Sequence, residues 1–257
     1  MLDCFDLTGK TALVTGASKG LGFVFAKALA QAGASLFITA RSEEELRANA
    51  RAVAELGAPC DWMVMDITRE DDVAEMVRRC VDRFGRIDIL VNNAACGRHN
   101  VPPQDVSRQD WDRVIETNLT GSFLCAREVG KQMIGQKGGK IINLASMSGL
   151  IINKGVHGGS YDISKHGVIG LTRALAVEWA PHNIQVNALA PGYIMTQINR
   201  DFFADHPETL QQFIDLTPVG RIGQPEDLEG AIVFLASRAS DFMAGSVLVI
   251  DGGYTCW

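Results

Sequence analysis

The sequence predicts a single α/β domain in which a doubly wound, seven-stranded parallel sheet carries helices on both faces. Short β-branched apolar runs alternate with longer segments of helical period, as in βαβ units. These runs are almost continuously apolar, which is typical of strands covered on both faces. The 257 residues contain no repeat, low-complexity tract or linker, so we expect one domain over residues 1–257.

Each expected element follows from this alternation. Strands are predicted at residues 11–15, 35–39, 61–65, 87–93, 140–146, 184–190 and 246–250. Helices are predicted at residues 20–31, 43–56, 69–84, 161–180 and 226–236, with a long one inside 107–136. Residues 191–225 form the only long irregular stretch, and we expect about 192–218 of it to be a substrate lid.

Composition and charge exclude several classes of protein. The 24 basic and 30 acidic residues give a net charge of -6, which disfavours a nucleic-acid partner. No apolar stretch approaches the roughly 18 residues of a membrane span, and the N-terminus lacks a signal-peptide pattern, so we expect a cytoplasmic protein. The six cysteines have no paired spacing, so we expect free thiols, no disulfide framework and no metal site.

The first chemical motif is TGASKGLG at residues 15–22. It follows the strand at 11–15 and opens the helix at 20–31. Glycines there let backbone N–H groups approach a phosphate at a helix N-terminus. The spacing is not that of the common GxGxxG pattern, and a tight strand-to-helix turn alone would also explain the cluster. The context favours a dinucleotide pocket.

The TGxxxGxG spacing resembles that of the short-chain dehydrogenase/reductase family. Further motifs of that family follow in order: NNAA at 92–95, ETNLTG around Asn118, Ser146 after a strand, YDISK at 161–165, PG at 191–192 and DGG at 251–253. The resemblance covers about residues 7–253. It implies a Rossmann fold and hydride exchange with a nicotinamide cofactor. Ala95 replaces the last glycine of the family's NNAG element, a change that we expect to be tolerated.

The expected reaction centre contains a tyrosine and a lysine. Tyr161 and Lys165 are four residues apart on one face of a predicted helix. A nearby ammonium lowers the pKa of a phenol, so Tyr161 would accept the alcohol proton in oxidation and donate one in reduction. The resemblance implies that Ser146 orients the substrate carbonyl and that Lys165 binds ribose. It also implies that Asn118 disrupts its helix and holds a water in a proton relay to Lys165. Ser148 competes with Ser146, which we favour because it directly follows the strand.

Two cations favour NADP over NAD as the cofactor. Arg41 follows the second strand and Lys19 precedes Gly20, with no acid opposing them there in the sequence. The resemblance implies that Asp66 contacts adenine, although Asp66 would also cap the next helix. The complete set of expected cofactor-binding residues is Gly16, Ser18, Lys19, Gly20, Leu21, Gly22, Arg41, Asp66, Ile67, Asn93, Ala94, Tyr161, Lys165, Pro191, Gly192, Ile194 and Thr196.

Substrate choice is expected in residues 96–101, in residues 150–160 and in the lid, because these segments follow strand ends. The first two carry Arg98, His99, Asn100, Asn153, Lys154, His157 and Ser160. Such side chains suit a polyhydroxylated or carboxylated small molecule. The C-terminal half resembles the gluconate 5-dehydrogenase and sugar/polyol dehydrogenase branch. A 3-oxoacyl-[acyl-carrier-protein] reductase is the near alternative, and a noncatalytic NADP-binding regulatory protein is an alternative of another class.

The resemblance also implies an assembly through the long fourth and fifth helices. We expect a homotetramer, with a homodimer second. Apolar contacts would come from Phe123, Ala126, Val129, Ala174, Leu175, Trp179 and Trp257, each of which would equally pack inside its own subunit.

Overall fold

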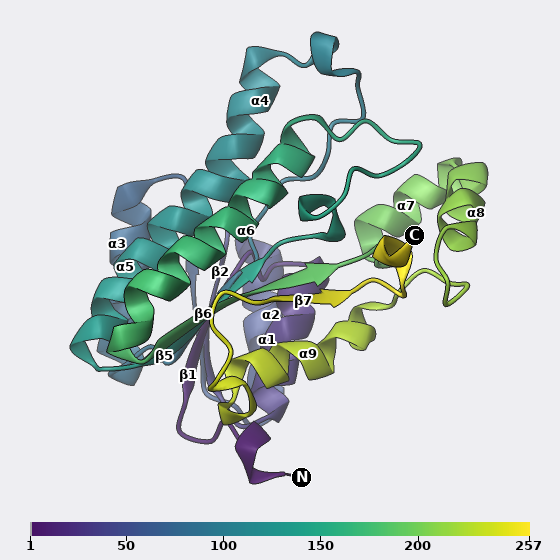
Figure 1. Cartoon of the computed structure of the whole chain (residues 1–257). Coiled ribbons are helices and arrows are strands. Elements are labelled where there is room, and N and C mark those ends of the chain that lie inside the picture. The colour runs from purple at the N-terminus through teal and green to yellow at the C-terminus, as the bar shows by residue number, and fades with distance from the viewer. Residues whose placement is uncertain (1) are drawn as a thin grey trace.

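The computed structural model describes residues 2–257 and contains one seven-stranded parallel sheet (Figure 1). Its strands are β1 (Thr11–Thr15), β2 (Ser35–Ala40), β3 (Cys60–Val64), β4 (Ile89–Asn92), β5 (Gly139–Leu144), β6 (Ile184–Pro191) and β7 (Val247–Ile250). They lie in the order β3-β2-β1-β4-β5-β6-β7, and every neighbouring pair is parallel. The predicted doubly wound fold is confirmed. The order reverses between β1 and β4, where ligands bind in such sheets.

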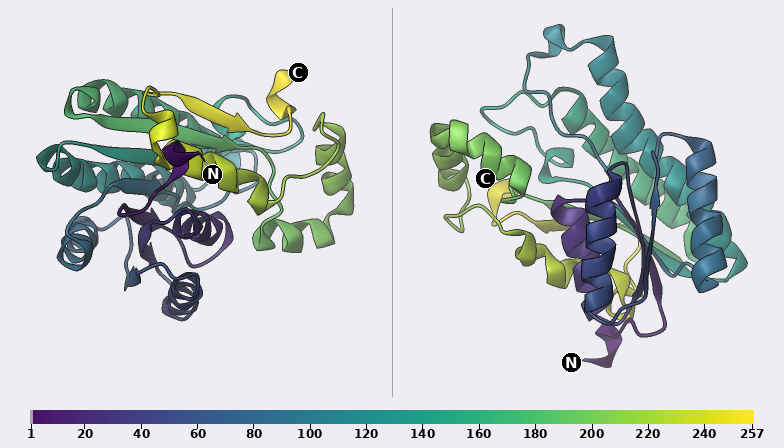
Figure 2. Two further views of the ribbon diagram at one scale, coloured as in Figure 1. Left: turned by 90° about the horizontal axis from the view of Figure 1, so that it is seen from below. Right: turned by 180° about the vertical axis from the view of Figure 1, so that it is seen from behind.

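Helices cover both faces of this sheet (Figures 1 and 2). One layer contains α1 (Gly20–Gln31), α2 (Glu43–Glu55) and α9 (Glu229–Ala236). The other contains α3 (Glu70–Phe84), α5 (Gly121–Gly135) and α6 (Gly159–Trp179). Right-handed crossovers between parallel strands place successive helices in this way.

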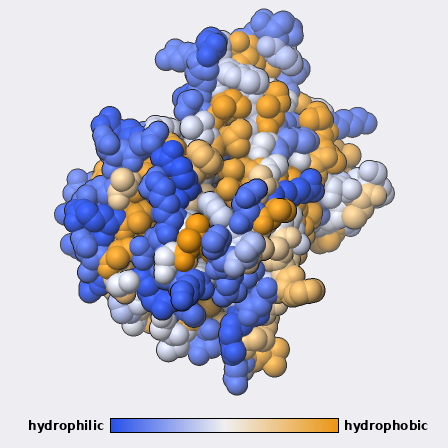
Figure 3. Space-filling view, turned by 60° about the vertical axis from the view of Figure 1, so that its left-hand side comes forward, coloured by the Kyte–Doolittle hydropathy of each residue, from blue (hydrophilic) through white to orange (hydrophobic). Residues whose placement is uncertain are grey.

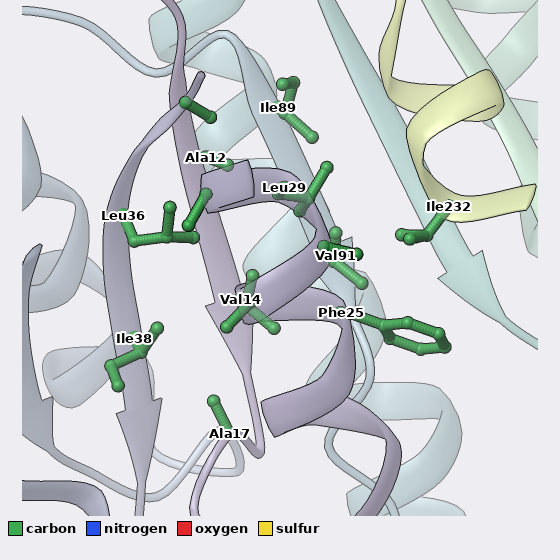
Figure 4. Close-up of a cluster of buried hydrophobic side chains, with 14 of the residues drawn as sticks. Ala12, Val14, Ala17, Phe25, Leu29, Leu36, Ile38, Ile89, Val91 and Ile232 are labelled. Atoms are coloured by element: carbon green, nitrogen blue, oxygen red, sulfur yellow. The ribbon is translucent and has the colours of Figure 1, made fainter. Parts of the chain in front are cut away.

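The core follows from the alternation of side chains along each strand. Ala12 and Val14 of β1 face the α1 layer, whereas Leu13 between them packs in the cluster under α3 and α5. Figure 4 shows the cluster on the α1 side, in which Phe25 of α1 and Ile232 of α9 lie near Val91 of β4. Burial of one such aromatic or aliphatic side chain contributes roughly 1.5–3 kcal/mol, so these layers hold the strand ends firmly.

The long helix predicted inside residues 107–136 is interrupted. It consists of α4 (Arg108–Ile115), a π-helical turn at Glu116–Thr120 and α5. A π turn inserts an extra residue per turn, and such turns occur frequently at functional sites. Here the turn contains Asn118, which is buried. The helix is thus disrupted at Asn118, as the family resemblance implied.

The prediction that residues 191–225 form an irregular stretch was wrong. They contain α7 (Gln197–Asp205) and α8 (Pro207–Asp215). Phe203 and Phe213 are buried with Ile222 in a small separate cluster, and the Tyr193 ring stacks on Phe213 with centroids 3.8 Å apart. Apolar residues of the two helices thus pack the segment onto itself. Each helix has only nine residues, so its periodic signal is weak.

The carboxyl ends of the strands position the candidate site. The segment after β4, the segment after β5 and the α7–α8 pair lie at this end of the molecule, away from the N-terminal segment (Figures 1 and 2). Within residues 2–257, no helix has the length and apolar character needed to cross a membrane.

Candidate active site

The turn between β1 and α1 depends on three glycines. Gly16 and Gly20 have φ of +68° and +58°, in the left-handed region that favours glycine. A Cβ on Gly22 would lie 2.3 Å from the Gly16 carbonyl oxygen, so glycine permits this close helix–strand approach. A Cβ on Gly20 would have a Thr196 methyl as its nearest neighbour, at 3.9 Å. The turn is tightly packed behind and open in front, which fits a phosphate group at the N-terminus of α1.

Two asparagines hold this turn in place. The Asn93 side chain donates to the carbonyls of Thr15 (2.9 Å) and Gly16 (3.0 Å), and its backbone N–H donates to the Thr15 hydroxyl. Asn49 of α2 donates to the carbonyls of residues 17 and 18 at 2.8 and 2.7 Å. No motif in the sequence points to Asn49, because α2 meets this turn only in the folded chain.

A cleft of about 460 Å³ runs from the glycine turn to the candidate reaction centre. The expected cofactor residues that line it are Gly16, Ser18, Lys19, Gly20, Leu21, Arg41, Asp66, Ile67, Asn93, Ala94, Tyr161 and Thr196. The others lie behind this lining: Gly22 packs against Gly16, Lys165 and Pro191 are buried, Gly192 packs against Asp251, and Ile194 belongs to the core. Lining residues that the sequence did not single out include Thr39, Ser42, Glu45, Met65, Thr117 and Gln197.

Charges of both signs occur at the adenosine end of the cleft. Lys19 and Arg41 line it as expected. Glu45, which the sequence did not single out, lines the same cleft because the first turn of α2 returns to it.

Asp66 is organised by its own turn. Its Oδ1 accepts hydrogen bonds from the backbone N–H and the hydroxyl of Thr68, at 2.9 and 2.8 Å. Asp72 of α3 in turn accepts from the Asp66 N–H. Asp66 thus shapes the turn before α3 while it lines the cleft. The expectation that it caps α3 was wrong, because the N-cap residue of that helix is Arg69. Beside it, Ile67 packs so closely on Gly121 that a Cβ there would lie 2.6 Å from the Ile67 Cδ1.

Tyr161 lines the other end of the cleft, and Ser146 and Lys165 lie beside it. The Ser146 hydroxyl is close enough to that of Tyr161 to lower the Tyr161 pKa. Lys165 Nζ donates to the Leu144 carbonyl (2.6 Å) and lies 5.7 Å from the centre of the Tyr161 ring. The competing serine, Ser148, instead accepts hydrogen bonds from Arg98 and Asn153. This arrangement favours Ser146 as the serine that meets a substrate.

The environment shifts the proton affinities of both residues. Burial raises the pKa of Tyr161, while the Ser146 hydrogen bond and the positive charge of Arg98 act to lower it. Burial lowers the pKa of Lys165 to about 8. Perturbed pKa values in a cleft are typical of groups that exchange protons during catalysis.

Asn118 ties two parts of the site together. Its Oδ1 accepts from the Cys96 N–H at 2.8 Å, and its Nδ2 donates to the Cys96 carbonyl and to the Ser164 hydroxyl, both at 3.1 Å. The side chain therefore joins the segment after β4 to α6, which carries Tyr161. The water relay remains a prediction.

The six cysteines are free thiols, as expected. Among residues 2–257, no three histidine, cysteine, aspartate or glutamate side chains are grouped as metal ligands.

Comparison with known proteins identifies the family. Residues 16–255 match the family model described as enoyl-(acyl carrier protein) reductase, one of the short-chain dehydrogenase models. The chain belongs to the short-chain dehydrogenase/reductase family. The predicted resemblance is therefore confirmed, and the protein is an oxidoreductase of this family related to the gluconate and polyol dehydrogenases.

Individual relatives match along almost their whole length. The chain is 43% identical to an uncharacterised oxidoreductase of Escherichia coli, over 98% of this chain and 95% of that protein. It is 40% identical to the gluconate 5-dehydrogenase of Gluconobacter oxydans, over 98% of this chain and 97% of that enzyme. A gluconate 5-dehydrogenase from Burkholderia cenocepacia, solved with NADP and tartrate, has a TM-score of 0.94 at 38% identity, covering 100% and 99% of the two chains.

Proposed function

We propose that the protein is an NADP(H)-dependent oxidoreductase that interconverts a secondary alcohol and a ketone on a sugar acid, keto sugar or polyol. The observation that carries this proposal is the convergence of Tyr161, Ser146 and Lys165 at one end of the cleft that begins at the glycine turn. The relatives named as gluconate 5-dehydrogenase and the NADP in one of their structures support the cofactor and the substrate class.

Each side chain of the site has a separate role in the proposed reaction. When bound, the nicotinamide cofactor supplies or accepts the hydride. Ser146 and Tyr161 hold the substrate oxygen through their hydroxyls, and Tyr161 donates its phenolic proton to that oxygen in reduction or accepts one in oxidation. The Lys165 ammonium stabilises the phenolate that remains. Asn118 keeps the segment after β4 fixed against α6, so that these groups stay aligned.

A substrate panel tests the proposed class. NADPH oxidation is measured against 5-ketogluconate, ketohexoses and a 3-oxoacyl thioester, with the reverse reactions on the corresponding alcohols. We expect keto sugars or keto sugar acids to give the highest kcat/KM, because the chain is 40% identical to a gluconate 5-dehydrogenase over nearly its whole length. A thioester preference would assign the enzyme to fatty-acyl chemistry, and tight NADPH binding without turnover would favour the regulatory alternative.

Cofactor choice is expected to depend on Arg41 and Glu45. Arg41→Ala removes a cation that receives the 2′-phosphate, so we expect its kcat/KM for NADPH to fall about 10- to 100-fold, with little change for NADH. Glu45→Gln removes an opposing charge and should move the preference further toward NADPH. Steady-state kinetics with both cofactors measure the two ratios. Equal effects of Arg41→Ala on NADPH and NADH would contradict a phosphate-binding role.

We also propose a homotetramer, and keep the expectation of a cytoplasmic location. Ala126 and Val129 are buried in their own subunit, which is the second of the two places expected for them. Figure 3 shows hydrophobic side chains gathered in the upper middle of one face, with hydrophilic groups above and to the left. Exposed apolar side chains on α4, α5 and α6 are Trp111, Phe123, Ile163 and Val177, and Phe242 and Trp257 are exposed near β7 and at the C-terminus. Light scattering at micromolar concentration that gave a monodisperse monomer would contradict an assembly.

A further inference from the structure

A buried ion pair lies directly beside the candidate proton donor. Asp162 follows Tyr161 in α6, and its side chain is only 2% exposed. Its Oδ1 accepts a hydrogen bond of 2.5 Å from the Arg98 Nη2, and the Arg98 side chain is 16% exposed. The same nitrogen donates to the Ser148 hydroxyl at 3.0 Å. The guanidinium thus has little freedom to leave this position.

Neighbouring residues make room for the pair and complete it. Asn153 donates to the Ser148 hydroxyl at 2.6 Å, so Ser148 links the segment after β5 to Arg98. A Cβ on Gly158 would lie 2.0 Å from the Asp162 Oδ2. A residue larger than glycine at position 158 would therefore displace the Asp162 carboxylate.

The guanidinium lies against the Tyr161 ring. Its central carbon is 5.3 Å from the ring centroid, on a residue whose hydroxyl lies close to that of Ser146. The charged and titratable groups that face Tyr161 are Arg98 and Cys96 from the segment after β4, and Asp162 and Lys165 from its own helix. Tyr161 therefore lies between two cations, of which Arg98 is held by a carboxylate one residue away.

We propose that Arg98, fixed by Asp162 and Ser148, is a positioning residue that holds a positive charge beside Tyr161 and so favours its ionised form during proton transfer. This inference rests on the proposed role of Tyr161 as proton donor and acceptor. A cation close to an acid lowers the pKa of that acid, and the charge of Arg98 acts on Tyr161 in this direction. The Asp162 carboxylate acts in the opposite direction, so the effect of Arg98 is partly offset.

The test is the pH profile of alcohol oxidation, in which Tyr161 must be ionised to accept the proton. Arg98→Met should move the acidic limb of kcat/KM upward by about one pH unit, because the phenol then loses its proton at higher pH. Arg98→Lys, which keeps the charge, should restore most of the wild-type profile. Arg108→Met removes a cation from the exposed face of α4 and should leave the profile unchanged.

A second variant separates this effect from misfolding. Arg98→Met leaves a buried carboxylate without its partner, which destabilises a fold. The double variant Arg98→Met/Asp162→Leu removes both charges and should recover the melting temperature while its acidic limb stays above that of the wild type. A double variant with the wild-type limb would overturn the inference, because the pair would then have no net influence on Tyr161.

A spectroscopic titration needs neither substrate nor cofactor. The chain has three tyrosines, so carbon-13 labelling of the tyrosine ζ carbon gives three signals, and Tyr161→Phe assigns one of them. We expect the Tyr161 signal to titrate at higher pH in Arg98→Met than in the wild type. If the wild type turns over no alcohol or ketone, the proposed function fails. If it is active and both the signal and the limb are unmoved in Arg98→Met, this inference alone fails.

Discussion

Tyr161→Phe is expected to lower kcat for ketone reduction by about 10²- to 10⁴-fold while NADPH binding stays within a few-fold of the wild type. The substitution removes the hydroxyl that lies close to that of Ser146 and leaves the ring in place. A positioned general acid contributes about that factor to a rate. Turnover is followed by NADPH absorbance, and binding by the fluorescence of the reduced cofactor.

Tyr254→Phe is the matched control for this change. Tyr254 is buried beside Tyr193 and does not belong to the lining of the cleft. Loss of that hydroxyl should leave kcat near the wild-type value. Near-wild-type turnover in Tyr161→Phe, together with normal NADPH binding, would contradict the proton-transfer mechanism.

Gly22→Ala is expected to damage both the fold and the cofactor site. The new methyl would lie 2.3 Å from the Gly16 carbonyl oxygen and 2.5 Å from the Asn93 Nδ2, so α1 must move away from the turn. Overpacking of this kind costs about 1–3 kcal/mol of stability. Because the same turn presents the N–H groups to a phosphate, we also expect at least a 10-fold weaker NADPH affinity.

Gly135→Ala provides the comparison. Gly135 ends α5, and a Cβ there would meet no atom within 4 Å. The same chemical change should therefore be neutral or stabilise the fold by about 0.4–1 kcal/mol. Denaturant unfolding and calorimetric NADPH titration measure the two effects. Equal stability and affinity in Gly22→Ala and the wild type would show that the turn tolerates a side chain.

Much of the fold was predictable because its signals are local. The strand β1 and the helix α1 are long enough for their apolar periods to stand out, and the glycine turn between them has a fixed spacing. Tyr161 and Lys165 also share a face simply because they are four residues apart on α6. Such features need no knowledge of distant contacts.

The contacts that were missed join distant segments. Arg98 was expected near the substrate, but its ion pair with Asp162, 64 positions away, has no local signal in the sequence. Glu45 reaches the cleft only because α2 begins beside the end of β2. Asn118 was found from its motif, whereas its hydrogen bonds to Cys96 and Ser164 were not. Local patterns do not encode these approaches.

The most direct test of hydride exchange is isotope transfer from NADPH deuterated at the transferring position of the nicotinamide. The wild type is incubated with the best ketone of the substrate panel, and the alcohol is analysed by mass spectrometry and carbon-13 NMR. We predict one deuterium bound to the new carbinol carbon, and formation of the labelled alcohol about 10²- to 10⁴-fold more slowly with Tyr161→Phe. An alcohol formed by the wild type without deuterium on that carbon would contradict direct hydride transfer in this cleft.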